Sequence, residues 1–113
     1  MITRVVTVKT RPGWAKELCR KLHEDVLHIL KAHPGFIDEI VLIADHDKDE
    51  VVAMSFWKTK ADAEDFQKKH FRHVSEMIEH LTHTAPKVHI YDVETSTVHH
   101  VGKGKAEPAL VGY

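Results

Sequence analysis

Two neighbouring segments of this chain carry apolar residues at both odd and even positions, namely residues 40–44 and 51–54. The polar run 45–49 between them has the length of a hairpin turn, so the two segments are expected to pair as antiparallel strands. Successive side chains of a strand point to opposite faces, so both faces of this part of the sheet need cover. Helices of the same chain can cover one face. A second copy of the chain is the economical cover for the other, which predicts a homodimer.

The segments around this hairpin complete a simple order of elements. Residues 2–9 are rich in β-branched side chains and predict a first strand. Apolar residues at helical spacing from Trp14 to Leu30 predict a helix that ends at Pro34 and Gly35. No Pro or Gly interrupts 60–81, so this region is one long helix or two pieces that abut near residues 70–71. Residues 88–93 predict a last strand, prolonged toward Val98.

With strands at 36–44 and 50–58, the order is β-α-β-β-α-β, the split βαβ plan of ferredoxin-like α+β folds. Its crossovers give an antiparallel sheet with both helices on one face. Residues 1–101 are expected to form this domain. Residues 102–113 are expected to be a flexible arm, or one that crosses onto the partner subunit.

Composition excludes several classes of protein. The 16 basic and 17 acidic side chains nearly cancel, which argues against a nucleic-acid partner. Cys19 is the single cysteine, so no internal disulfide is expected. No apolar run approaches the roughly 20 residues of a membrane span, and the first residues do not resemble a signal peptide. We therefore expect a cytoplasmic protein without a membrane partner.

Two motifs carry a family resemblance. One is Pro34-Gly35-Phe36 at the start of the second predicted strand, and the other is the junction Trp57-Lys58-Thr59 with Ala61 and Ala63 after the third. The chain resembles the antibiotic biosynthesis monooxygenase family of the dimeric α/β-barrel superfamily over residues 2–95. The resemblance implies a homodimer whose two sheets close into a barrel, with a pocket between sheet and helices in each protomer.

The family hosts several chemistries. Members include cofactor-independent oxygenases of polycyclic phenols, haem-degrading enzymes and an isomerase of a signalling furanone. Many members carry a histidine nine residues after the tryptophan, where this chain has Phe66, which weakens the isomerase hypothesis. The haem-degrading branch has an asparagine near the position of Val6 and a ligand histidine near Glu76, with His73 one turn away. These departures disfavour haem degradation and leave haem binding open.

His70 is the candidate catalytic residue. It lies on the apolar stripe between Phe66 and Val74, so we expect it to point toward the pocket and to act as a general acid or base. The alternative is a histidine at the edge of the core that bonds a backbone carbonyl. The candidate substrate-binding residues are Trp57, Phe66, Phe71, His73, Met54 and Tyr91.

No cofactor and no metal site is predicted. His70 and His73 have a spacing that can share a metal ion, but two imidazoles are fewer ligands than such sites normally use. Three functions remain open. The first is a cofactor-independent monooxygenase of a small aromatic or quinol-like substrate, the second a haem-binding or haem-degrading protein, and the third a non-catalytic small-molecule binding module.

Overall fold

The computed structural model describes residues 1–99. Within them the helices and strands follow the predicted order. The elements are β1 (Ile2–Lys9), α1 (Ala15–Lys21), a π-helical segment (Leu22–Val26), α2 (Leu27–Ala32), β2 (Phe36–Ile43), β3 (Glu50–Trp57), α3 (Lys60–Ile78), a 3-10 turn (Glu79–Leu81) and β4 (Lys87–Asp92).

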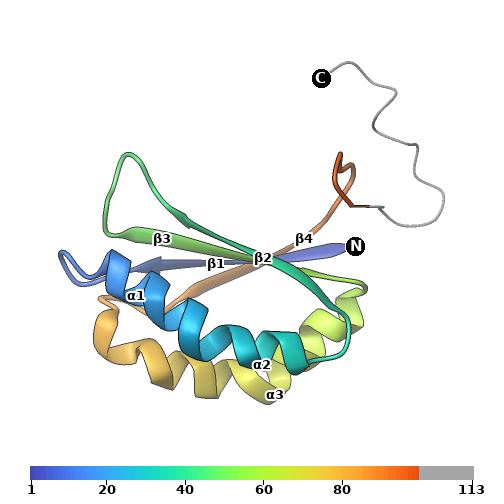
Figure 1. The fold of residues 1–113 in the computed structure, drawn as a ribbon, viewed down its shortest axis with the longest axis horizontal. Helices are drawn as coiled ribbons and strands as arrows, with labels where there is room; N and C mark the ends of the chain where they lie inside the picture. Colours follow the sequence, from blue (N-terminus) through green and yellow to red (C-terminus); the bar gives the residue numbers. More distant parts are fainter. Residues whose placement is uncertain (100–113) are drawn as a thin grey trace.

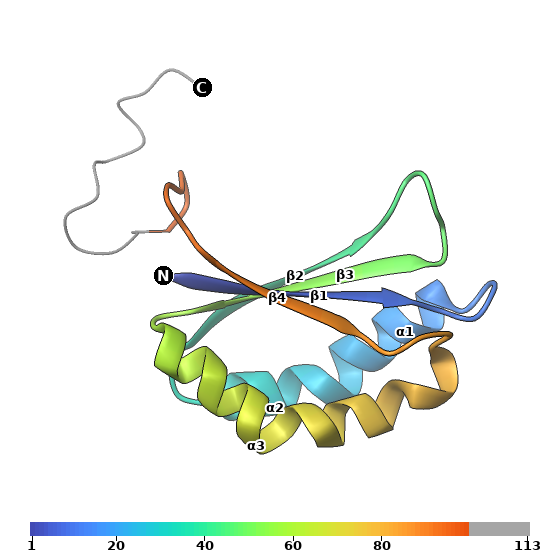
Figure 2. The same ribbon diagram turned by 180° about the vertical axis from the view of Figure 1, so that it is seen from behind.

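The four strands form one antiparallel sheet in the order β2-β3-β1-β4. Figures 1 and 2 show α1, α2 and α3 on the same side of this sheet. The ferredoxin-like α+β fold predicted from the sequence is thus confirmed. The core lies between the two layers, where Trp57, Phe66 and Leu18 are almost wholly buried.

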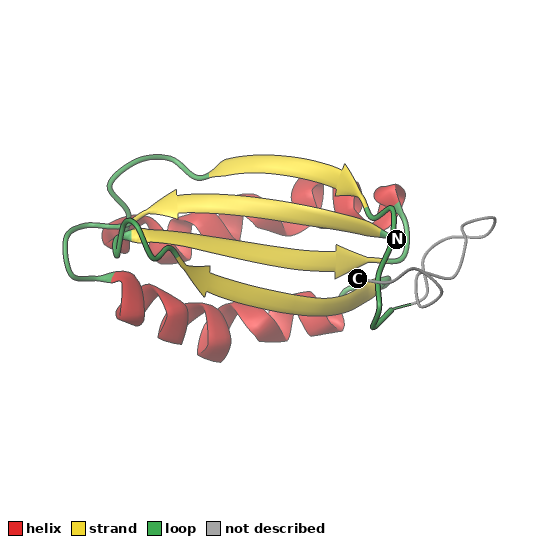
Figure 3. Ribbon diagram, turned by 90° about the horizontal axis from the view of Figure 1, so that it is seen from above, coloured by secondary structure: helices red, strands yellow, loops and turns green. Residues whose placement is uncertain are grey.

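Within residues 1–99 no helix lies on the opposite face of the sheet, as Figure 3 shows from above. Cross-strand pairing places Val5, Ile40, Leu42, Met54 and Tyr91 on this open face. Ile40, Leu42 and Tyr91 are 44%, 45% and 54% exposed, which is high for such large apolar side chains. The β2–β3 hairpin therefore carries apolar side chains on both faces of the sheet, as its sequence indicates.

α1, the π-helical segment and α2 follow one another directly and together form the first helix. Periodicity did not predict the wider π-helical turn in its middle. Leu18, Leu22, Val26 and Leu30 are all buried, yet they are spaced by exactly four residues. Over three such steps a regular α-helix would rotate the stripe by about 120°. The π-helical segment accommodates one extra residue per turn, which keeps the four leucine and valine side chains facing the sheet.

The other helix is a single piece. α3 runs through residues 70–71 without a break and closes in the 3-10 turn. The side chain of Thr59 caps its first turn by accepting a hydrogen bond from the backbone N–H of Asp62 at 3.1 Å. The hydroxyl of Thr59 in turn donates to Asp62 Oδ2 at 2.9 Å, so Thr59 and Asp62 form a capping pair.

Two sequence-based boundaries were wrong. β4 ends at Asp92 and is not prolonged toward Val98. Asp92 pairs with Ile2, the first residue of β1, and the Val93 N–H donates to the Met1 carbonyl at 2.9 Å, so β4 ends where its neighbouring strand begins. Trp14 precedes α1 and is 49% exposed, although the periodicity placed it on the buried stripe. The predicted arm, 102–113, lies outside the described residues.

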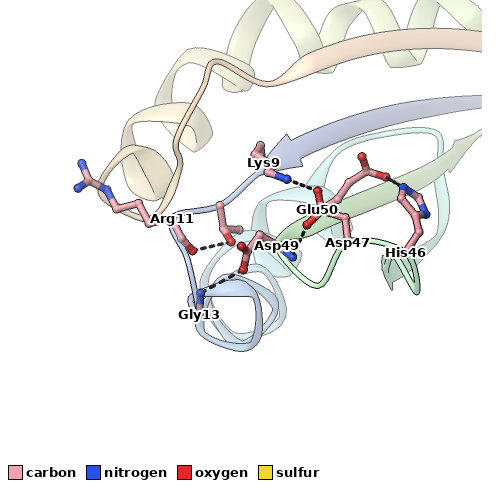
Figure 4. A network of polar contacts seen from close by, with 8 residues as sticks. Lys9, Arg11, Gly13, His46, Asp47, Asp49 and Glu50 are labelled. Atoms are coloured by element: carbon pink, nitrogen blue, oxygen red, sulfur yellow. Dashed lines mark hydrogen bonds and ion pairs between the residues drawn. The ribbon is translucent and has the colours of Figure 1, made fainter.

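A polar network ties the β2–β3 turn to the loop after β1 (Figure 4). Asp49 Oδ1 accepts a hydrogen bond from the Gly13 N–H at 3.0 Å, and the Asp49 carbonyl accepts one from the Thr10 N–H at 2.8 Å. Lys9 pairs with Asp47 beside it. These bonds satisfy backbone groups at the ends of strands and hold the turn against the body of the domain.

Candidate functional site

A small cavity of about 40 Å³ lies between the sheet and the helices. Its walls are mostly aliphatic and aromatic, with contributions from β1, β2, β3, the first helix and α3. Three polar side chains enter this apolar lining: Arg4, Ser55 and Glu39. Apolar pockets with a few convergent polar groups are the usual form of small-molecule sites.

The three polar residues lie in one row across the sheet. Arg4 of β1 is paired with Ser55 of β3, and Ser55 is paired with Glu39 of β2. Directly paired residues share a face of the sheet, so all three side chains belong to the helix side. Neighbouring strands are about 4.8 Å apart, so the backbones of Arg4 and Glu39 are separated by roughly 10 Å, with Ser55 between them.

Arg4 is only 4% exposed and reaches over two aromatic rings of α3. The carbon of its guanidinium lies 4.5 Å from the ring centre of Phe71 and 5.5 Å from that of Phe66. Its Nε donates a hydrogen bond to Gln67 Oε1 at 3.0 Å. Burial lowers the pKa of Arg4 to about 10, so it still carries its charge at neutral pH.

Glu39 stands between the cavity and a groove on the surface. The groove has a volume of about 410 Å³ and is bordered by the first helix and by β2, with Cys19, His23 and Lys31 among its lining residues. Burial, and to a lesser degree the charge of Asp38, raise the pKa of Glu39 to about 7. A carboxyl group with this pKa can accept and return a proton near neutral pH.

Only two of the predicted site residues line the cavity. These are Phe66 and Phe71. Trp57 is fully buried beside Phe66 and donates a hydrogen bond from Nε1 to Ser55 Oγ at 2.9 Å, so it orients a residue of the row. Met54 and Tyr91 lie on the open face of the sheet, on the far side from the cavity. Strand parity, which the sequence did not define, decides this separation.

His70 and His73 lie elsewhere. They border a surface groove of about 640 Å³ between α2 and α3, together with His28 and His33. The expectation that His70 points into the sheet-helix cavity was therefore wrong. The apolar stripe of α3 is wide enough that its edge, where His70 lies, faces the neighbouring helix rather than the sheet.

His33, which the sequence did not single out, is the buried histidine of this groove. Its Nε2 lies 2.9 Å from Asp65 Oδ2 and its Nδ1 lies 3.0 Å from the carbonyl oxygen of Pro34. Its ring makes edge contacts with Trp57, Phe66 and His70 at 5.5–5.8 Å. These contacts fix His33 at the end of the first helix, and they are those of a structural residue.

Arg4 and Glu39 are the site residues that sequence reasoning missed. Arg4 carried a detectable signal, because it alternates with Val6 and Val8 on what became the buried face of β1. Glu39 carried none, because a bulge between Phe36 and Asp38 shifts the register of β2. In a regular strand without a bulge, Glu39 would lie on the opposite face from Phe36, because the two residues are three positions apart.

No group of three or more His, Cys, Asp or Glu side chains within residues 1–99 is placed to hold a metal ion. In the same range no helix combines the length and the apolar character that a membrane crossing requires.

The fold and this cavity define a ferredoxin-like α+β domain with an apolar pocket between sheet and helices. The family model described as "Antibiotic biosynthesis monooxygenase" matches residues 1–86, so the chain belongs to this family. The comparison with curated proteins finds no match.

Solved structures share the fold of this chain. The chain is similar to the monooxygenase from ActVA-Orf6 of Streptomyces coelicolor in complex with Nanaomycin D, with 19% identity, a TM-score of 0.70, and coverage of 80% of this chain and 84% of the other. It is also similar to SnoaB, a cofactor-independent oxygenase from Streptomyces nogalater, at 12% identity and a TM-score of 0.69 over 87% and 97% of the chains. PA3566 from Pseudomonas aeruginosa matches at 25% identity and a TM-score of 0.61 over 80% and 90%. The TM-scores establish a shared fold, and identities this low establish nothing beyond it.

Proposed function

We propose that the protein is a cofactor-independent monooxygenase of a small aromatic or quinol-like substrate. The observation that carries the proposal is the apolar cavity into which the half-buried carboxyl of Glu39, with a pKa of about 7, projects. Membership of the family supports the reaction class. Glu39 replaces His70 as the proposed base, because His70 borders the surface groove between α2 and α3.

In this mechanism the ionised carboxylate of Glu39 takes the proton from a phenolic hydroxyl group. The resulting anion is electron-rich and transfers one electron to dioxygen. The two radicals then combine to form a carbon–oxygen bond, and the oxygen–oxygen bond breaks. One oxygen atom enters the ring as a quinone carbonyl. The other leaves as water with the two hydrogens that the substrate has lost, so no external reductant is needed.

In this proposal the protein supplies an apolar cavity that excludes water and one buried positive charge, Arg4, for the anion. Aliphatic and aromatic walls exclude water from the reacting radicals, which suppresses leakage of reduced oxygen. The buried charge of Arg4 lies in the same cavity and favours the anionic form of a bound phenol.

The size of the cavity limits the substrate. An apolar cavity that holds benzene measures about 150 Å³, several times the 40 Å³ enclosed here. A ring therefore enters only if side chains at the wall move. Phe71 is the best candidate for that movement, because it is partly exposed and packs against the edge of the core. A single-ring substrate fits better than a polycyclic one.

We also propose that two copies associate through the open face of the sheet. The exposed Ile40, Leu42 and Tyr91 form an apolar surface that a second sheet can bury. Such a dimer places the two cavities on the outer sides of the joined sheets, since each cavity lies on the helix side of its own sheet.

Oxygen uptake tests the activity. Small single-ring quinols are supplied as substrates, with hydroxyanthrones as the polycyclic comparison, and uptake by the wild type is compared with uptake by Glu39→Gln and by the matched surface variant Glu64→Gln. Loss of the base should lower the rate by about 10²–10⁴-fold in Glu39→Gln. Glu64→Gln should match the wild type.

The rival base is tested in the same assay. Loss of turnover in His70→Ala, with Glu39→Gln unaffected, would return the role to His70 and refute the assignment to Glu39. Binding of these compounds without oxygen uptake would identify a binding module instead. Haem binding gains no support from the cavity, because no histidine is among its lining residues within residues 1–99. A hemin titration without a Soret shift would remove that alternative.

A further inference from the structure

The guanidinium group of Arg4 uses only part of its hydrogen-bonding capacity. Arginine has five N–H donors. In Arg4, Nε and Nη2 both donate to one acceptor, Oε1 of Gln67. Nη1 donates to no acceptor within residues 1–99. No buried polar side-chain atom in this part of the chain lacks a partner, so the unused donors of Arg4 are not sealed in the core, and Arg4 is one of the residues that line the cavity.

The charge of Arg4 is also without a carboxylate partner. No Asp or Glu oxygen in the described part of the chain lies within 4 Å of its nitrogen atoms. The ion pairs of this part of the chain are mostly between exposed side chains and do not include Arg4. Gln67 is neutral, and the rings of Phe71 and Phe66 offer only their weakly negative faces. Buried charges in proteins are normally paired, so an isolated one is a place where an anion is favoured.

The surroundings limit which anion fits. Phe66, Phe71 and Val74 from α3 line the same cavity, together with aliphatic residues of the strands. Inorganic anions carry a tight hydration shell that such walls cannot replace. An aromatic ring that bears one oxyanion instead matches both parts of the cavity, because the ring lies on apolar walls and the oxyanion meets the cation.

We propose that Arg4 is a binding residue for the oxyanion of a small aromatic ligand, with the ring lying toward Ser55 and Glu39. This inference rests on the proposed function in one respect: the ligand is the substrate, or resembles it. The guanidinium group receives a carboxylate or a phenolate oxygen through Nη1 and the remaining N–H of Nη2. Gln67 holds the guanidinium in position by accepting hydrogen bonds from Nε and from Nη2.

Calorimetric titration with two probes tests the site. Benzoate carries the charge, and benzamide has nearly the same shape without it. The wild type should bind benzoate at least tenfold more tightly than benzamide. Arg4→Met should lose that preference, whereas the same substitution at the exposed Arg11 should retain it. Equal binding of the two probes to the wild type, or an unchanged preference in Arg4→Met, overturns the proposal.

A second measurement covers the case in which Arg4→Met does not fold. The Nε–H resonance of Arg4 in ¹⁵N-labelled wild type is assigned with the variant Arg4→Lys, in which it is missing. Benzoate should shift this resonance and benzamide should not. A resonance that benzoate leaves in place contradicts the site directly. Titration with 4-nitrophenol separates a phenolate from a carboxylate preference, because bound phenolate raises the absorbance of the anion.

These outcomes are distinct from those of the oxygenase test. Preferential benzoate binding without oxygen uptake from any quinol leaves the anion site standing and removes the proposed activity. Oxygen uptake without a benzoate preference has the opposite meaning: the activity stands and the role of Arg4 falls.

Discussion

Glu39 shows how the position of one side chain sets its chemistry. The glutamate side chain is half-buried on the helix side of β2, beside Asp38. Lost contact with water disfavours its charged form, and the neighbouring carboxylate adds to the effect, which raises its pKa from the usual 4.5 to about 7. The same residue type at Glu64, on the exposed side of α3, has no such surroundings.

The raised pKa predicts how stability depends on pH. Between pH 4.5 and about 7 the folded protein keeps the proton of Glu39, whereas the unfolded chain has released it. The free energy of unfolding should therefore fall as the pH rises through this window. Because the group keeps some contact with water, Glu39→Gln should be more stable than the wild type by roughly 1–2 kcal/mol at pH 8 and about equal to it at pH 4.5.

Urea unfolding at the two pH values measures this difference. Glu64→Gln serves as the control and should follow the wild type at both. A Glu39→Gln curve parallel to that of the wild type across the whole range would show that Glu39 titrates normally.

At the scale of elements, one inserted residue in β2 decides which side chains meet. Phe36 pairs with Trp57, and Asp38 pairs with the next residue of β3, Phe56, so Ile37 is the extra residue of a bulge. The bulge turns Glu39 toward the helices and Asp38 toward the open face. β-bulges often re-aim a side chain next to a functional site, and here the bulge brings a carboxyl group into the cavity.

The junction between the first helix and β2 depends on Gly35. Its φ of +86° is a conformation that side chains with a Cβ rarely adopt. A Cβ at this position would also overlap the Asp62 carboxyl group and lie 2.6 Å from the Asp62 Cβ, so the capping pair of α3 would be displaced. Gly13 has nearly the same φ, +82°, with nothing within 4 Å of such a Cβ.

This pair of glycines predicts two different costs. Gly13→Ala should lower the free energy of unfolding by about 1–2 kcal/mol, the cost of the left-handed conformation alone. Gly35→Ala should lower it by roughly 1 kcal/mol more, because the cap of α3 is lost as well. Thermal and urea unfolding of the two variants measure the difference. Equal losses would mean that Asp62 adjusts without breaking its bond to Thr59.

At the scale of the whole molecule, the open face of the sheet is the feature that no helix of residues 1–99 covers. Leu42 and Ile43 are adjacent in β2 and similarly exposed, at 45% and 37%. Leu42 lies on the open face, since it pairs with Val52, and Ile43 lies on the helix side, since it pairs with Val51. They therefore form a matched pair for testing whether that face is an interface.

Light scattering at micromolar concentration should give twice the 12.9 kDa chain mass for the wild type. Leu42→Lys places a charge in the proposed interface and should shift the protein toward the monomer. Ile43→Lys should keep the dimer, because its side chain points away from the partner. A monomeric wild type, or dissociation in both variants, would contradict association through the open face.

Much of the fold could be read from the sequence because it depends on local patterns. Periodicity located both helices and all four strands, and Pro34 and Gly35 marked where the first helix ends. The end of β4 was missed, since a strand stops where its neighbour stops and the segment itself carries no sign of it. The family resemblance was confirmed by the match to residues 1–86.

The amino-acid sequence by itself determined the element order, the antiparallel sheet with helices on one face, and the apolar surface left on the other. The tertiary structure alone decided which side chains share the cavity. It separated Met54 and Tyr91 from Phe66 and Phe71, and it placed His70 in the surface groove between α2 and α3. It also brought Arg4 and Glu39 to the wall of the same cavity. Side chains alternate with a period of two, so one bulged residue or a slip in register exchanges the faces of a strand. Only the paired sheet defines that register.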